Sequence, residues 1–245
     1  MLRVLDLFSG IGGFSLGLER TGGFQTVAFC EIEEFPRKVL QKHWPDVPIY
    51  EDVTNADFGP IGPVDVVAAG FPCQDISLAG KGAGLAGERS GLFWHILRTV
   101  RMVGQPMLVL ENVAALLSRG MGSVLGALAQ IGYDTQWHCI PASAVGASQK
   151  RDRIWIVANA SGERAARLLT SADIGEAGQR RAGGKANLQH VADAPFEPGD
   201  CYPQPLLRGL DCRVPKRMDR VKAAGNSVDP AIPELIGRAI LDVPR

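Results

Sequence analysis

The chain has 245 residues, of which 46% are hydrophobic and 21% charged, and its 26 basic and 26 acidic side chains cancel. This composition is typical of a folded globular chain and excludes an intrinsically disordered or collagen-like one. No run approaches the roughly 18 consecutive apolar residues of a membrane-spanning helix, so we expect no membrane interaction. The segment from Met1 to Phe8 carries charges within its apolar run and lacks a small-residue cleavage site, which predicts a first strand rather than a signal peptide.

The spacing of the five cysteines predicts neither a disulfide framework nor a zinc site. Their number is odd and none forms a CxxC pair: Cys30, Cys73, Cys139, Cys201 and Cys212. We therefore expect no metal, a cytoplasmic location, and thiols that are mostly buried in a reducing environment.

Short strand-like runs alternate with helical stretches through the first 160 residues. The expected strands are Arg3–Leu7, Thr26–Glu31, Val47–Tyr50, Val64–Ala69, Met107–Leu110, Gln136–Ile140 and Arg153–Ala158. The expected helices are Phe14–Arg20, Glu33–His43, Leu92–Val103, Val124–Ile131 and, near the C-terminus, Pro230–Leu241. This alternation predicts an α/β fold with a mostly parallel, doubly wound sheet and helices on both faces.

The regular pattern stops between residues 159 and 205, which are rich in Gly, Ala, Arg and Pro and lack branched apolar periodicity. This composition predicts a small irregular module or a partly mobile insertion. Charge also changes along the chain: residues 1–147 carry 10 basic and 14 acidic side chains, whereas residues 148–225 carry 14 and 9. A basic stretch fits a polyanionic partner, and it fits a solvated surface about equally well.

A glycine-rich turn joins the first expected strand to the first expected helix, within Asp6–Phe14. Its glycines let the backbone turn tightly and approach a ligand, and the helix start offers unpaired N–H groups. Glu31 lies 18 residues after Gly13, where a carboxylate can accept hydrogen bonds from both hydroxyls of a ribose. Ser15 stands where the dinucleotide-binding fingerprint requires its third glycine. The turn alone fits a structural loop, but together with Glu31 it favours a ligand that contains a ribose.

A cysteine follows directly on the expected strand that is richest in small apolar residues. In Gly70–Gln74, Pro72 fixes its own φ and restricts Phe71, so Cys73 is expected on a stiff turn at the end of a strand. Open α/β sheets place their chemistry at such strand ends, which favours a reactive thiol, although most isolated cysteines are inert. The glycine-rich run from Gln74 to Gly91 is long for a connector and fits a mobile lid.

Two further groups of polar residues lie at the ends of expected strands. Glu111 and Asn112 end the strand that begins at Met107. Gln149, Arg151 and Arg153 occupy alternating positions before the last expected strand and would share one face.

In this order, the blocks resemble the motifs of the DNA (cytosine-5) methyltransferase family, particularly its compact phage and prophage members. Two more blocks carry the resemblance: Asp52 within Glu51–Thr54, and Gly225–Val228. The resemblance covers about residues 1–158 and 206–241. It implies the Rossmann-like fold of S-adenosylmethionine-dependent methyltransferases, S-adenosyl-L-methionine as cofactor and double-stranded DNA as partner.

The resemblance also implies three segments. A catalytic and cofactor-binding domain would span residues 1–158, and a short target-recognition segment would span 159–205. Residues 206–245 would return to the catalytic domain. A monomer is expected, with a cognate restriction endonuclease as a further partner.

The family's chemistry gives roles to the matching residues. Cys73 would add to C6 of a cytosine flipped out of the duplex, which activates C5 for methylation. Glu111 would hydrogen-bond N3, and Arg153 would hold O2. The implied cofactor contacts are Asp6, Phe8, Ser9, Gly10, Ile11, Gly12, Gly13, Glu31, Ile32, Asp52, Val53, Pro72, Leu92, Asn226 and Ser227. The implied DNA contacts are Gln74, Ser77, Asn112, Gln149 and Arg151.

Two departures from the family pattern keep alternatives open. Ser148 stands where the family usually has a proline, and the segment 159–205 is shorter than a usual target-recognition domain. The tRNA-methylating branch of the same family and a non-catalytic remnant that binds cofactor or DNA are the alternatives. A nicotinamide dehydrogenase is disfavoured, because it would leave Cys73, Glu111 and Arg153 without a role.

Overall fold

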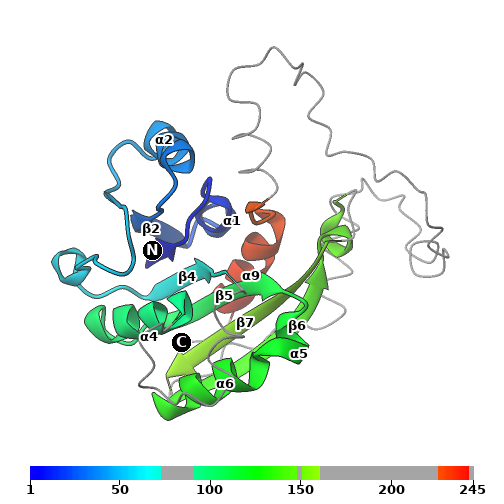
Figure 1. Cartoon of the computed structure of the whole chain (residues 1–245). Helices are drawn as coiled ribbons and strands as arrows, with labels where there is room; N and C mark the ends of the chain where they lie inside the picture. Colours follow the sequence, from blue (N-terminus) through cyan, green and yellow to red (C-terminus); the bar gives the residue numbers. More distant parts are fainter. Residues whose placement is uncertain (73–90, 148–150, 161–225, 243–245) are drawn as a thin grey trace.

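The protein is described by a computed structural model over residues 1–72, 91–147, 151–160 and 226–242 (Figure 1). These residues form a seven-stranded sheet in the order β3-β2-β1-β4-β5-β7-β6. The strands are β1 (Leu2–Leu7), β2 (Phe24–Cys30), β3 (Ile49–Tyr50), β4 (Val66–Gly70), β5 (Met107–Val113), β6 (Tyr133–Pro141) and β7 (Asp152–Ala160). The helices are α1 (Gly13–Glu19), α2 (Glu34–His43), α4 (Leu92–Met102), α5 (Leu116–Arg119), α6 (Met121–Gln130) and α9 (Ala231–Leu241), with short 3-10 turns at Gly59–Ile61 and Ala142–Val145.

The central strands of the sheet are parallel, and the strand direction reverses only on the side that contains β7. β1 pairs in parallel with β2 and β4, β2 with β3, and β4 with β5, whereas β7 is antiparallel to β5 and β6. The chain first moves outward from β1 to β3 and then returns to β4 on the other side of β1. The mostly parallel, doubly wound sheet predicted from the sequence is therefore confirmed. Its topological switch point lies between β1 and β4, where such sheets bind ligands.

Alternating side chains on β4 explain why helices cover both faces of the sheet. Val66 and Ala68 pack into one core cluster with α1 and α9, while Val67 and Ala69 pack into a second cluster with α4 and α6. All four are buried. A strand with apolar residues on both faces cannot lie at a solvated surface, so it fixes a three-layer arrangement around the switch point.

Glycines let the C-terminal helix α9, red in Figure 1, pack closely against α1. A methyl group placed on Gly17 would lie 2.2 Å from the Pro230 carbonyl oxygen, and one on Gly13 would lie 2.4 Å from the Val228 carbonyl oxygen. Both contacts are with backbone atoms, which cannot turn away as a side chain can. This close packing holds the segment that begins at Asn226 against the glycine-rich turn after β1.

The element boundaries differ from the predicted ones by up to a few residues, and some features were missed. β2 ends at Cys30, so Glu31 is the first residue beyond it, and β7 runs to Ala160 rather than stopping at 158. The short helix α5 was not predicted. Arg151 precedes β7 with a φ of 25° and is therefore not in the extended conformation that the alternation with Arg153 assumed. Within the described ranges, no helix is both long and apolar enough to cross a membrane.

Candidate functional site

A cavity of about 700 Å³ opens at the switch point, at the carboxyl ends of β1, β2, β4 and β5. It is continuous from the segment after β2 to the strand pair β5–β7. Of the residues predicted from the sequence, those lining it are Phe8, Gly10, Glu31, Ile32, Asp52, Val53, Pro72, Leu92, Glu111, Asn112, Arg151, Arg153 and Asn226. Other residues line the cavity but were not among the site residues predicted from the sequence: they include Cys30, Glu33, Phe35, Pro36 and Glu51.

The remaining predicted site residues lie elsewhere. Asp6, Ser9, Ile11, Gly12, Gly13 and Ser227 do not line the cavity. Cys73, Gln74, Ser77 and Gln149 lie outside the described residues, as do most of the expected lid and almost all of the expected target-recognition segment. The described neighbour of Cys73, Pro72, is on the cavity wall.

The turn after β1 brings backbone N–H groups to the cavity by means of an unusual conformation. Phe8 has a φ of 54°, a left-handed value that is strained for a residue with a Cβ by roughly 1–3 kcal/mol. Gly10 and Gly12 have φ values of 54° and 85°, which glycine adopts without strain. Ser9 fixes the turn, because its Oγ donates to the Asp6 carbonyl at 2.6 Å and its N–H donates to the Cys30 carbonyl at 3.1 Å.

Behind this turn, Asp6 is fully buried and ties β1 to α1. Its Oδ2 accepts a hydrogen bond from Ser15 Oγ at 2.7 Å, while its Oδ1 has no partner among the described residues. Burial raises the pKa of Asp6 to about 8, because a buried carboxylate loses its hydration. Ser15, which breaks the dinucleotide-binding fingerprint, therefore has a structural use of its own.

Glu31 enters the cavity with both carboxylate oxygens held by backbone donors. Oε2 accepts from Gly10 N–H at 2.7 Å, and Oε1 accepts from Glu33 N–H at 2.7 Å. Each carboxylate oxygen can accept two hydrogen bonds, so Glu31 retains capacity for two hydroxyl groups of a ligand. Its orientation is set before any ligand arrives.

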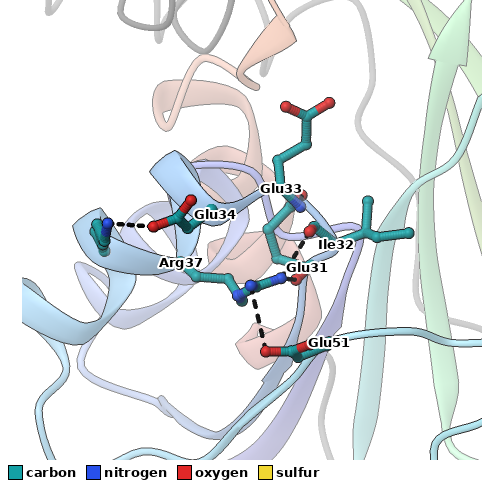
Figure 2. A network of polar contacts seen from close by, with 7 residues as sticks. Glu31, Ile32, Glu33, Glu34, Arg37 and Glu51 are labelled. Carbon is teal, nitrogen blue, oxygen red and sulfur yellow. Dashed lines mark hydrogen bonds and ion pairs between the residues drawn. The ribbon is translucent and has the colours of Figure 1, made fainter. Parts of the chain in front are cut away.

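Figure 2 shows Arg37 of α2 between two loops that line the cavity. Its Nη1 donates to the Ile32 carbonyl at 2.6 Å and to the Glu31 carbonyl at 3.3 Å. Its Nη2 lies 3.2 Å from Oε1 of Glu51, in the loop after β3. One guanidinium thus connects the segment after β2 to the segment after β3.

Asp52 follows Glu51 and closes its own turn. Its Oδ1 accepts from Thr54 N–H at 2.8 Å, and this bond holds the pKa of Asp52 below its usual value. The same loop is fixed from α4, because Arg98 donates to the carbonyls of Val53, Thr54 and Ala56 at 2.9–3.3 Å.

At the other end of the cavity, Glu111 of β5 forms an ion pair with Arg153 of β7. Arg153 Nε lies 2.8 Å from Glu111 Oε1. The antiparallel register places Glu111 opposite Trp155, so Arg153 is its diagonal neighbour on the same face. Burial raises the pKa of Glu111, and the positive charges of Arg153 and Arg151 oppose this shift. Asn112 points to the other face, where its amide donates to the Phe71 carbonyl at 2.8 Å.

The space for this ion pair depends on the glycine that ends β4. A methyl group placed on Gly70 would lie 3.3 Å from Glu111 Oε2. That distance is tighter than most contacts of a real Cβ, so a larger residue would displace the carboxylate. The short spacing therefore places Glu111 directly against the strand end that precedes Pro72.

Cys30 also lines the cavity, at the end of β2. Burial and, to a smaller extent, the nearby acidic groups of Glu31, Asp52 and Asp6 together raise the pKa of its thiol to about 12. Cys30 is thus a neutral thiol at physiological pH.

The cavity is electrostatically divided. Its acidic end contains Glu31, Glu33, Glu51 and Asp52, and its basic end contains Arg151 and Arg153 beside Glu111. Burial and the adjacent Arg153 guanidinium lower the pKa of Arg151. Across the parts of the chain that the structure describes, no group of three or more His, Cys, Asp or Glu side chains is arranged to hold a metal ion.

Comparison with solved structures finds the same architecture in methyltransferases. Dnmt2 methyltransferase of S. pombe matches with a TM-score of 0.57 at 19% identity, over 71% of this chain and 54% of that chain. A structure described as a DNA modification methyltransferase encoded within an E. coli prophage matches with a TM-score of 0.54 at 27% identity, over 65% of this chain and 47% of that chain. The fold is thus the Rossmann-like fold of S-adenosylmethionine-dependent methyltransferases.

Sequence comparison finds type II methyltransferases. M2.BsuMI of Bacillus subtilis is 34% identical over 64% of this chain, and M.Eco47II of Escherichia coli is 38% identical over 63%. The chain spans only 42% and 39% of the lengths of these two relatives. The family model for C-5 cytosine-specific DNA methylases matches residues 2–190, which is most of the sequence. The chain therefore belongs to the C-5 cytosine-specific DNA methylase family.

Proposed function

We propose that this protein transfers a methyl group from S-adenosyl-L-methionine to C5 of cytosine in double-stranded DNA. One observation carries the proposal: a single cavity connects a preoriented ribose-type carboxylate, Glu31, to the partly buried Glu111–Arg153 pair. Between them lies the strand end that leads, through Pro72, to Cys73. The proposed cofactor end and the proposed base-recognition end therefore share one cavity, and the strand end that precedes Cys73 lines it as well.

The acidic end of the cavity fits the proposed cofactor. S-adenosyl-L-methionine supplies an electrophilic methyl group on a positively charged sulfonium, and carboxylates favour such a cation. Glu31 can accept hydrogen bonds from ribose hydroxyls, and Phe8, Ile32 and Phe35 offer apolar surface for an adenine ring.

The same end of the cavity is unsuited to a nicotinamide dinucleotide. In dinucleotide-binding folds, N–H groups of the glycine-rich turn face the pyrophosphate. Here the Gly10 N–H donates to the Glu31 carboxylate instead. A pyrophosphate would also face the negative charges of Glu33, Glu51 and Asp52. This arrangement disfavours the dehydrogenase considered from the sequence.

Residues at the basic end can activate a cytosine. In the proposed reaction, the Cys73 thiolate forms a bond to C6, and the displaced electron pair moves into the ring toward C5 and N3. A carboxyl group with a raised pKa retains a proton at higher pH than usual, so Glu111 is suited to donate a hydrogen bond to N3. Arg153 would hold O2 and orient the ring. The electron pair at C5 would then form the bond to the methyl group, and S-adenosyl-L-homocysteine would be the leaving product. Loss of the C5 proton and expulsion of the Cys73 thiolate from C6 would then restore the aromatic ring.

The macromolecular substrate is proposed from the family and the charge pattern. The named relatives are type II methyltransferases, which supports DNA modification linked to a cognate restriction endonuclease. Because the reacting atoms of cytosine are stacked inside a duplex, the base must leave the stack to reach a pair that lines a cavity, such as Glu111 and Arg153. Arg151, which also lines the cavity, and the basic stretch 148–225 would contact phosphates, which position DNA without reading sequence.

The test is methyl transfer from labelled S-adenosyl-L-methionine to duplex DNA and, separately, to tRNA. Transfer to DNA alone supports the proposal, and transfer to tRNA alone supports the tRNA-methylating branch. A duplex containing 5-fluorocytosine should trap the wild-type chain covalently but not the Cys73→Ala variant. Cofactor binding without transfer or trapping on any substrate would identify a non-catalytic remnant. Bisulfite sequencing of host DNA after expression would give the target sequence.

A further inference from the structure

The acidic end of the cavity is built from two loops, one after β2 and one after β3. These two strands pair with each other over only two residues. Glu31 follows β2, whereas Glu51 and Asp52 follow β3, a strand of only two residues at the edge of the described sheet. β3 is held by two paired positions on β2 and by a few backbone hydrogen bonds, including Glu31 N–H to the Tyr50 carbonyl at 2.9 Å. The separation between the two loops therefore depends on side-chain contacts as well.

Arg37 supplies such a contact and also fixes the orientation of Glu31. The Ile32 carbonyl that accepts from Arg37 belongs to the same peptide unit as the Glu33 N–H. That N–H donates to Glu31 Oε1. Because a peptide unit is planar, holding its carbonyl fixes the direction of its N–H and hence the position of the carboxylate oxygen. The Nη2 contact to Glu51 then joins this unit to the loop that carries Asp52.

The Arg37 guanidinium is suited to this role by its shape and its position. It is planar and presents several N–H donors in a fixed fork. Its side chain is 22% exposed, whereas that of Glu51 is 73% exposed. The ion pair alone would therefore contribute little. The two carbonyl contacts add to it: that with the Glu31 carbonyl is partly buried, and that with the exposed Ile32 carbonyl is the shorter, at 2.6 Å.

We propose that Arg37 is a positioning residue for the nucleoside part of the cofactor, holding Glu31 and the Glu51–Asp52 loop at a fixed separation. This inference rests on the proposed function. It gives Arg37 no contact with the reacting atoms, so its removal should weaken cofactor binding and leave the transfer step nearly unchanged. The family resemblance did not single out Arg37, and in the sequence it is one basic residue among many.

The experiment compares Arg37→Met, Arg37→Lys and Lys38→Met in the full-length chain. Lys38 is the matched control, because it is the next residue on α2 and both side chains of its ion pair with Glu34 are exposed. Calorimetry should show that Arg37→Met weakens binding of S-adenosyl-L-homocysteine at least about tenfold, since three contacts are lost. Arg37→Lys should lie between wild type and Arg37→Met, and Lys38→Met should stay within about twofold of wild type.

Kinetics separate positioning from general destabilisation. Arg37→Met should raise the KM for S-adenosyl-L-methionine, with little change in the kcat measured at saturating cofactor. If Arg37→Met does not fold, Glu51→Gln removes the loop contact and should raise the same KM by a smaller factor. If the folded Arg37 variants bind S-adenosyl-L-homocysteine as tightly as the wild-type chain does, this inference is overturned and the proposed function is not. Equal weakening by Lys38→Met would also overturn it. Failure of the wild-type chain to bind S-adenosyl-L-homocysteine would overturn the proposed function as well.

Discussion

The close contact between α1 and α9 predicts that a glycine-to-alanine substitution in α1 destabilises the protein, whereas the same change in a helix without such a contact stabilises it. Gly17 is inside α1, where alanine is normally favoured over glycine by about 1 kcal/mol. A methyl group there would lie 2.2 Å from the Pro230 carbonyl oxygen and 2.8 Å from Pro233 Cβ, so the two helices must separate. Overpacking of this kind costs about 1–3 kcal/mol. We therefore expect Gly17→Ala to destabilise the protein by up to about 2 kcal/mol, after the gain in helix propensity is subtracted.

The matched control is Gly126→Ala in α6. Gly126 is exposed, and a methyl group placed on it meets nothing within 4 Å. Only the helix propensity then changes, and the variant should be stabilised by about 0.5–1 kcal/mol. Urea unfolding of both variants measures the difference, and each kcal/mol should shift the melting temperature by roughly 2–4 °C.

A second readout links this contact to the site. Displacement of α9 would carry Asn226 away from the cavity, so Gly17→Ala should also weaken binding of S-adenosyl-L-homocysteine, whereas Gly126→Ala should not. Two results would contradict the close packing of α1 against α9. One is a Gly17→Ala variant as stable as the wild type, and the other is a change in the free energy of unfolding that has the same sign in both variants.

Three further predictions concern single carboxylates and the thiol. Cys73→Ala should abolish methyl transfer while leaving the cofactor dissociation constant within a few fold, as measured by calorimetry; residual full activity would remove Cys73 from the mechanism. Glu31→Gln should weaken cofactor binding more than it slows single-turnover transfer, and the reverse pattern would contradict the role given to Glu31. Because the pKa of Asp6 is raised to about 8 from an ordinary 3.8, the folded protein keeps a proton that the unfolded chain releases, so stability should fall as the pH rises from about 4 to 8. Asp6→Asn should flatten this decline in urea unfolding at pH 5 and pH 8, and an unchanged slope would assign the decline to another group.

The sheet could be predicted from the sequence because central strands such as β1 and β4 are buried on both faces. Val64–Ala69 is nearly continuous in small and branched apolar residues, a pattern that fits a central parallel strand and little else. The order of motifs also indicated which strand ends would meet, since parallel strands present their carboxyl ends at one edge. The predicted residues Glu31, Asp52, Glu111 and Arg153 do line one cavity.

The contacts that orient the site could not be predicted in the same way. Arg98 contacts Val53 across 45 positions of sequence, and Arg37 acts through backbone carbonyls, which every residue possesses. The left-handed conformation of Phe8 was also unexpected, because a residue with a Cβ normally avoids it. Such features arise from how elements pack, and a periodic pattern in one segment carries no signal for them.

The environment of Cys30 has a chemical consequence if the cavity binds an alkylating agent, as proposed. A sulfonium methyl donor reacts with thiolates, and Cys30 lies on the wall of the very cavity in which such a donor would bind. With a pKa of about 12, only roughly one Cys30 in 10⁵ would be ionised at neutral pH. Burial of Cys30, reinforced by the carboxylates that would attract a cationic donor, thus disfavours methylation of the protein at this sulfur.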